Sequence, residues 1–304
     1  MTNLLDDLTT EQVNPRTRNI DCQSTEEIVR LINEEDRQIA EKIQELTPVI
    51  AKAVDYILES FQKGGRLLYV GAGTSGRLGI LDASECPPTY GTDPSMVQGI
   101  IAGGDRAIKD PVEGAEDSAE TGAADIEDLL KVGPNDTVVG IAASGRTPYV
   151  LGAMKRAREL GATVIGLCNN HHTPMCQYAH HVIEAVVGPE VVLGSTRMKA
   201  GTAQKLVLNM LTTTAMIRFG KVYDNLMVDL NPSNGKLVHR AKRIISLATG
   251  AVEPQVSEAY DAADGHVKTA TVMLLAGVDR VTADRLLVET GGFVRKAVKL
   301  ATNS

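Results

Sequence analysis

The sequence predicts an open α/β fold with a parallel sheet of five strands, followed by a small helical bundle. Short apolar runs alternate with helical segments through the middle of the chain, as in sheets whose strands are covered by helices on both faces. Towards the C-terminus only helical spacing remains. The expected strands are 67–70, 96–102, 137–142, 163–167 and 182–187.

Residues 1–54 are expected to form an N-terminal arm and helices outside the sheet. A polar stretch to about residue 20 indicates an extended arm. Ser24 can cap the helix that follows it. A second amphipathic helix is expected from Ile39 to about Phe61, with a break near Pro48.

Residues 55–230 are expected to form the sheet domain and residues 231–304 the helical domain. In the sheet domain, helices are expected at 76–84, 111–130 and 147–160, and a long helix over 203–217 closes it. In the helical domain, glycines separate the expected segments. These segments are 236–248, 253–263, 266–276, 282–290 and 292–301.

The composition indicates a globular protein and argues against several functions. Of 304 residues, 43% are hydrophobic and none is tryptophan, and the net charge is −7, so neither stacking platforms nor a cationic surface for nucleic acid is expected. There is no apolar run of membrane-spanning length and no signal peptide, which predicts a cytoplasmic protein without a membrane partner. The cysteines are expected to be reduced thiols: Cys22, Cys86, Cys168 and Cys176.

Two similar turns suggest a phosphate site. Gly71–Arg77 and Ala143–Pro148 each contain Ser-Gly-Arg, and each lies between an expected strand and an expected helix. Such turns direct backbone N–H groups and a helix N-terminus towards one point, which favours an anion. Ser75, Ser144 and Thr147 are the expected side-chain donors, whereas Arg77 and Arg146 can either pair with phosphate or lie in solvent.

Other ligands are less consistent with the sequence. The first turn matches the GxGxxG pattern of dinucleotide sites, but Asp93 precedes the second strand and Asp105 lies too far along the chain to bind a ribose. A phosphorylated sugar is therefore favoured over a nucleotide. Metal binding is the minority interpretation for a group of histidines and cysteines whose spacing matches no common zinc pattern: Cys168, His171, His172, Cys176, His180 and His181.

Several carboxylates are candidates for acid–base chemistry. Glu85 lies between small residues and a double proline, which is expected to end the preceding helix, and partial desolvation would raise its pKa. The alternative is an ordinary surface residue. A second group of carboxylates is expected on one helical face, where the spacing does not choose among them: Asp110, Glu113, Glu116 and Glu120.

Motifs along almost the whole chain resemble the family of N-acetylmuramic acid 6-phosphate etherases. The resemblance implies a flavodoxin-like sugar isomerase (SIS) fold, a homodimer, and removal of D-lactate from a cell-wall sugar phosphate without metal or nicotinamide. The alternative functions are a sugar-phosphate sensor such as the glucokinase regulatory protein, a sugar-phosphate isomerase and a dehydrogenase. The motifs that carry the resemblance are residues 10–15, 71–89, 112–117, 142–148, 194–202 and 225–229.

The resemblance also implies the two catalytic residues. The two catalytic glutamates of the family fall on Glu85 and Glu116, with Glu85 assigned as the acid and Glu116 as the C2 base, although the reverse assignment stays open. The substrate-binding residues are expected to be Gly73, Thr74, Ser75, Ser144, Gly145, Arg146, Thr147, Ser195 and Lys199.

The expected helix over 76–84 has a geometric consequence. If it is unbroken, Glu85 lies roughly 13 Å along it from the first turn, which is long for one hexose phosphate. The sequence therefore suggests a site assembled from two subunits.

Overall fold

The computed structural model describes residues 8–230, 232 and 235–303. The chain separates into two compact units. The first contains the residues up to Ser84 together with Ser95–Thr212, and the second contains Glu85–Pro94 together with the residues from Thr213 onward. The domain boundaries expected at residues 54 and 230 stay predictions.

The first unit is built on a five-stranded parallel sheet, which confirms the predicted fold class. The strand order is β2-β1-β3-β4-β5. Gly71 at the end of β1 lies opposite Ile141 at the end of β3, so the turns after these strands lie next to each other at one edge. The strands are β1 (Leu67–Gly71), β2 (Val97–Ile101), β3 (Thr137–Ile141), β4 (Thr163–Cys168) and β5 (His181–Glu184).

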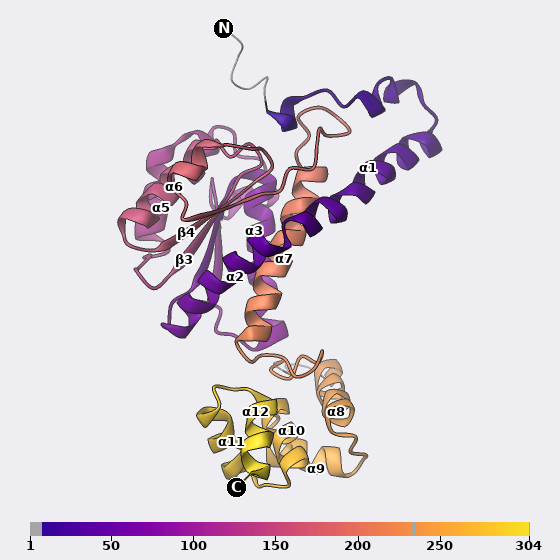
Figure 1. The fold of residues 1–304 in the computed structure, drawn as a ribbon, viewed down its shortest axis with the longest axis vertical. Coiled ribbons are helices and arrows are strands. Elements are labelled where there is room, and N and C mark those ends of the chain that lie inside the picture. The colour runs from indigo at the N-terminus through magenta and orange to yellow at the C-terminus, as the bar shows by residue number, and fades with distance from the viewer. Residues whose placement is uncertain (1–7, 231, 233–234, 304) are drawn as a thin grey trace. The chain divides into compact units, whose positions relative to one another are not determined.

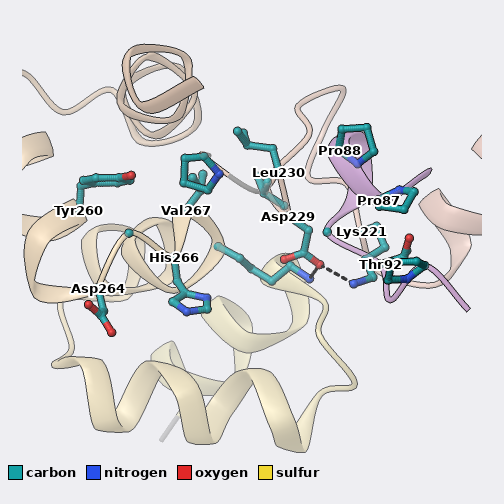
Figure 2. Close-up of a pocket in the computed structure, with 16 residues that line it drawn as sticks. Pro87, Pro88, Thr92, Lys221, Asp229, Leu230, Tyr260, Asp264, His266 and Val267 are labelled. Carbon is teal, nitrogen blue, oxygen red and sulfur yellow. Dashed lines mark hydrogen bonds and ion pairs between the residues drawn. The ribbon is translucent and has the colours of Figure 1, made fainter. Parts of the chain in front are cut away.

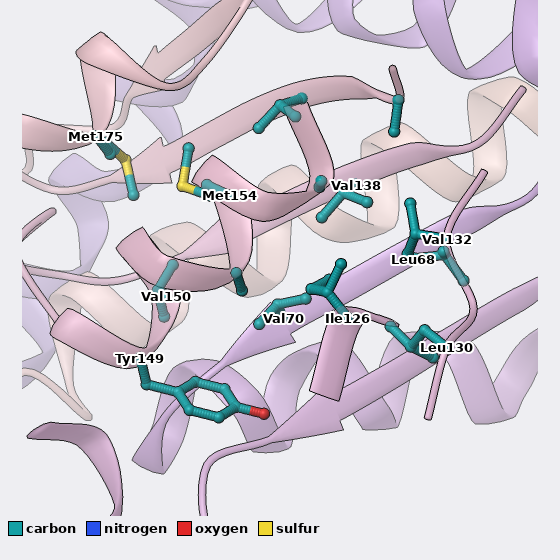
Figure 3. Close-up of a cluster of buried hydrophobic side chains, with 14 of the residues drawn as sticks. Leu68, Val70, Ile126, Leu130, Val132, Val138, Tyr149, Val150, Met154 and Met175 are labelled. Atoms are coloured by element: carbon teal, nitrogen blue, oxygen red, sulfur yellow. The ribbon is translucent and has the colours of Figure 1, made fainter. Parts of the chain in front are cut away.

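Helices cover both faces of this sheet (Figure 1). On one face, α5 (Ala119–Asp128) and α6 (Pro148–Glu159) pack against every second residue of the strands. Figure 3 shows Leu68, Val70 and Val138 in that core. On the opposite face the Tyr69 hydroxyl donates to Asp82 Oδ2 at 2.9 Å. The helices of that face are α2 (Thr47–Gln62), α3 (Gly73–Tyr90) and α7 (Lys199–Arg218).

The described part of the N-terminal arm is a series of short 3-10 turns. They are η1 (Thr9–Glu11), η2 (Pro15–Thr17) and η3 (Ile20–Cys22), and the remaining seven residues of the expected arm lie outside the described residues. Ser24 caps α1 (Thr25–Glu45) by accepting from the Glu27 N–H at 3.3 Å. The break near Pro48 is confirmed, because α1 ends at Glu45 and α2 begins at Thr47, but the expected helix start at Ile39 is wrong, since Ile39 lies inside α1. Pro48 lies in the first turn of α2, where its missing N–H costs no hydrogen bond.

The expectation that the double proline ends the helix is wrong. Helix α3 runs through Pro87 and Pro88 to Tyr90. Each proline lacks the N–H that would bond the carbonyl four residues earlier, so the helix continues past two missing hydrogen bonds. Gly91 then ends the helix with a φ of +59° and donates its N–H to the Pro87 carbonyl at 2.9 Å.

The expectation of a single helix over 111–130 is also wrong. The expectation that the neighbouring carboxylates share one helical face is wrong for the same reason. Gly114 has a φ of +70° and Ser118 caps a new helix by accepting from the Thr121 N–H. Two short elements take its place, η4 (Ala115–Asp117) and α5, and a four-residue helix, α4 (Arg106–Lys109), precedes them. Glu116 therefore lies in η4, and Glu120 in a different helix.

The C-terminal part of the second unit is a helical bundle around its own apolar core, as expected. Its helices are α8 (Gly235–Thr249), α9 (Gln255–Ala262), α10 (Val267–Ala276), α11 (Arg280–Glu289) and α12 (Val294–Thr302). A further short turn, η5 (Pro174–Gln177), belongs to the first unit. In the described ranges, the structure has no helix with the length and apolar character that crossing a bilayer requires.

Candidate functional site

A cavity of about 240 Å³ lies where β1 and β3 end, and it belongs entirely to the first unit. Residues from both predicted phosphate turns line it, together with one of the two expected catalytic glutamates. The expected site residues on its wall are Gly73, Thr74, Ser75, Glu116, Ser144 and Thr147.

Close backbone packing shapes the first turn. A Cβ on Gly71 would lie 2.6 Å from the Gly76 nitrogen, and a Cβ on Gly76 would lie 2.5 Å from a side-chain carbon of Ile101. Only glycines allow this approach. Helix α3 therefore begins directly after β1, and Gly73 and Thr74 of its first turn line the cavity. The first turn of a helix leaves N–H groups without intrahelical partners, which suits an anion.

Ser75 links the first turn to α7 and, through it, to the segment that follows β4. Its hydroxyl donates to Gln204 Oε1 at 2.8 Å, and the Gln204 amide donates to Asn169 Oδ1 at 2.9 Å. The Ser75 proton is thus engaged within the protein, and it must turn away from Gln204 to reach an anion. The backbone N–H groups of the turn are the more direct donors.

The second turn leaves two hydroxyl groups available. Ser144 Oγ accepts from the Arg146 N–H at 3.2 Å, so its own proton can be donated into the cavity. Thr147 precedes α6 and makes no side-chain cap hydrogen bond. Gly145 is required between them, because its φ is +65° and a Cβ there would lie 2.5 Å from the Thr173 hydroxyl.

The arm supplies a carboxylate that the residue-level reasoning did not single out. Glu11 and Thr10 line the cavity. Thr10 is fixed there, because its N–H donates to Asn170 Oδ1 at 3.3 Å and its hydroxyl accepts from Asn170 Nδ2 at 3.1 Å. Thr10 and Glu11 belong to one of the motifs that carry the family resemblance. Only the folded arm shows that Glu11 lines the same cavity as Glu116.

Five expected site residues do not line this cavity. Gly145, Arg146 and Ser195 are chain neighbours of residues that do. Glu85 is exposed on α3, so the desolvation expected from its apolar neighbours is absent in the single chain. Lys199 is the fifth expected site residue that does not line the cavity.

Lys199 is buried at the start of α7 in an ion pair. Its Nζ lies 2.6 Å from Glu35 Oε2 and donates to the Pro189 carbonyl at 3.1 Å, and both charged side chains are at most 4% exposed. Asn14 and Arg16 of the arm also bind Glu35. Burial alone would raise the pKa of Glu35, but hydrogen bonds from Lys199 and Asn14 hold it below its usual value. Lys199 therefore ties the arm, α1 and α7 together.

The histidines that were considered as metal ligands each contact a different part of the protein. The His171 ring contacts Glu184 at 2.7 Å, His180 Nδ1 accepts from the Val164 N–H, and His181 Nε2 contacts the Val49 carbonyl. Across the described ranges, no group of three or more His, Cys, Asp or Glu residues has a metal-binding arrangement. The cysteines are free thiols as expected, and burial raises the pKa of Cys168 to about 11.

Comparisons with known proteins agree with this architecture. Residues 49–158 match the glucokinase regulatory protein N-terminal SIS domain, and residues 117–214 match the SIS domain. Proteins named N-acetylmuramic acid 6-phosphate etherase from Aliivibrio fischeri (strain MJ11) and Photorhabdus laumondii are 56% and 55% identical, covering 96% and 97% of this chain and 97% of each relative. One from Streptomyces coelicolor is 53% identical over 98% of this chain and 95% of that protein.

Proposed function

This chain belongs to the N-acetylmuramic acid 6-phosphate etherase family, and we propose that it cleaves the D-lactyl ether of N-acetylmuramic acid 6-phosphate. The products are N-acetylglucosamine 6-phosphate and D-lactate, as in the recycling of cell-wall amino sugars. The observation that carries the proposal is one cavity in which both phosphate-type turns meet Glu116. It supplies an anion site and a proton acceptor to one small molecule.

The proposed reaction is a lyase reaction, an elimination followed by a hydration. The sugar ring opens to an aldehyde, which makes the C2 proton acidic, and a base removes this proton. The C3–O bond then breaks, and lactate leaves with a proton from the acid. Water adds its hydroxyl group to C3 of the unsaturated aldehyde and C2 is reprotonated, so the sum is ether plus water giving two products. Neither step changes the net redox state, so the reaction needs no nicotinamide.

The turns after β1 and β3 bind the phosphate in this proposal. Backbone N–H groups at the start of α3 and the hydroxyls of Ser144 and Thr147 are the donors. Glu116 is the C2 base, and Glu85 protonates the departing lactate oxygen and then activates water. Lys199 acts as an anchor for the wall of the site, through the buried ion pair with Glu35.

The position of Glu85 supports a site shared by two subunits of a homodimer. Helix α3 is continuous from Gly73 to Tyr90, so Glu85 lies about 15 Å along the helix from Ser75. Two helices of this face also expose large apolar side chains, Leu81 on α3 and Met210 on α7, which a partner subunit would cover. We therefore assign the acid at each site to Glu85 of the other subunit.

The reaction is tested by incubating the protein with N-acetylmuramic acid 6-phosphate in water enriched in ¹⁸O. Elimination and hydration predict one D-lactate per sugar, with the label on C3 of the sugar and none in the lactate. Label in the lactate would contradict the mechanism. Saturable binding without lactate would favour the sensor, and C2 proton exchange with a change of carbonyl position would favour the isomerase.

The cytoplasm is the proposed location. The four cysteines are free, as is usual in a reducing compartment. The proposed ligand is a small sugar phosphate, and the partner is a second copy of the chain rather than a nucleic acid or a membrane.

A further inference from the structure

A second and larger cavity lies wholly within the second unit (Figure 2). Its volume is about 820 Å³, and none of its lining residues lines the cavity at β1 and β3. Neither Glu85 nor Glu116 borders it. The residues that matter here are Pro87, Thr92, Lys221, Asp229, Leu230 and Lys268.

Two ammonium groups in this cavity share one carboxylate oxygen. Lys221 Nζ lies 3.2 Å from Asp229 Oδ2, and Lys268 Nζ bonds the same oxygen. All three side chains are at most 20% exposed. Burial and the neighbouring charge of Lys221 lower the pKa of Lys268, against the opposite effect of Asp229. This cluster therefore carries one formal positive charge more than its carboxylate balances.

The other carboxylate on the cavity wall, Asp264, does not neutralise this remaining positive charge. Asp264 is 78% exposed and lies 3.8 Å from Arg280, which is not a lining residue. His266 precedes α10 and gives it no side-chain cap hydrogen bond. The N-terminal N–H groups of this ten-residue helix add to the positive potential around Lys268.

A buried hydroxyl on the same wall has no partner. Thr92 is 7% exposed, and its Oγ1 has no hydrogen-bond partner among the described residues. Such a group is unfavourable unless a partner satisfies it. Because Oγ1 is itself shielded from solvent, the Thr92 side chain must rotate to reach a ligand in the cavity. Gly91 holds Thr92 beside the charged cluster, because a Cβ on Gly91 would lie only 2.2 Å from the Asp229 carbonyl oxygen.

We propose that this cavity binds a small molecule with a phosphate or carboxylate group, held by Lys221 and Lys268 with a hydrogen bond from Thr92. The volume falls within the range of small-molecule pockets, so it accommodates more than a bare ion. Pro87 and Leu230 on the wall provide apolar contact for the rest of the molecule.

Calorimetric titration with inorganic phosphate and with D-lactate tests this proposal and identifies the anionic group. The wild type is expected to bind at least one of them at this cavity, and Thr92→Val to bind it about tenfold more weakly, since a hydrogen bond to a charged group is lost. Lys268→Met is expected to remove the binding. Binding of phosphate alone or of lactate alone would support the proposed site and would identify the anionic group that it prefers.

Thr271→Val is the matched control. Thr271 is a buried threonine of the same unit that does not line the cavity, and its hydroxyl donates to the Val267 carbonyl at 2.8 Å. Without ligand, we expect Thr271→Val to lower the melting temperature and Thr92→Val to leave it unchanged or raise it. The proposal is overturned if neither probe binds, or if Thr92→Val and Lys268→Met bind both probes as the wild type and Thr271→Val do.

Discussion

Replacing Glu116 with glutamine is expected to lower kcat for D-lactate release by about 10²- to 10⁴-fold, the usual contribution of a general base. Glutamine keeps the size of the side chain but accepts no proton at neutral pH. KM is expected to change little, because the turns at Ser75 and Ser144, which we propose bind the phosphate, remain intact. The measurement is steady-state release of D-lactate at several substrate concentrations.

Glu113→Gln is the control for this prediction. Glu113 is an exposed carboxylate three residues away that does not line the cavity, so its replacement is expected to leave kcat near the wild-type value. An equal loss in both variants would point to a general charge effect. A wild-type rate in Glu116→Gln would remove Glu116 from the chemistry.

Replacing Lys199 with methionine is expected to lower the melting temperature by about 10 °C. The change leaves Glu35 buried without its principal partner, and breaking such a pair costs about 3–5 kcal/mol. Lys205→Met on the same helix is the control, because Lys205 is exposed and donates to Asn209 Oδ1 at 2.9 Å. Equal melting temperatures for the two variants would contradict the anchoring role of Lys199.

The anchoring pair also predicts how stability depends on pH. The folded-state pKa of Glu35 lies below its ordinary value of 4.5, so its contribution is present above that value and is lost as the pH falls through the lower, folded pKa. The difference in melting temperature between the wild type and Glu35→Gln is therefore expected to be largest near neutral pH and to shrink in acid. A difference that grows on acidification would contradict this.

The fold and the positions of the two Ser-Gly-Arg turns were predictable because their signals are local. Apolar runs mark the buried strands, and a strand followed by Ser-Gly-Arg marks a helix N-terminus at the sheet edge. The pairing of β1 with β3 then brings Ser75 and Ser144 to one cavity. Helix boundaries were less predictable, because Pro87 and Pro88 are tolerated near a helix end and Gly114 interrupts an acidic stretch.

Contacts between distant segments account for what the sequence did not reveal. Glu11 reaches the cavity only because Asn170, 160 residues away, binds Thr10. Lys199 was expected at the ligand, but it pairs with Glu35, which lies 164 positions away, and no local pattern shows their pairing. Spacing also did not select Glu116 from the neighbouring carboxylates, whereas the resemblance and then the cavity did.

The most direct test of the shared site is complementation between two inactive variants, Glu85→Gln and Glu116→Gln, mixed under conditions that allow subunit exchange. In a mixed dimer, one site would combine the intact Glu116 of one subunit with the intact Glu85 of the other. Random mixing therefore predicts about one quarter of the wild-type rate of D-lactate release. If exchange is complete and the mixture stays as inactive as either variant alone, both glutamates of a site come from the same subunit, and the shared site is wrong.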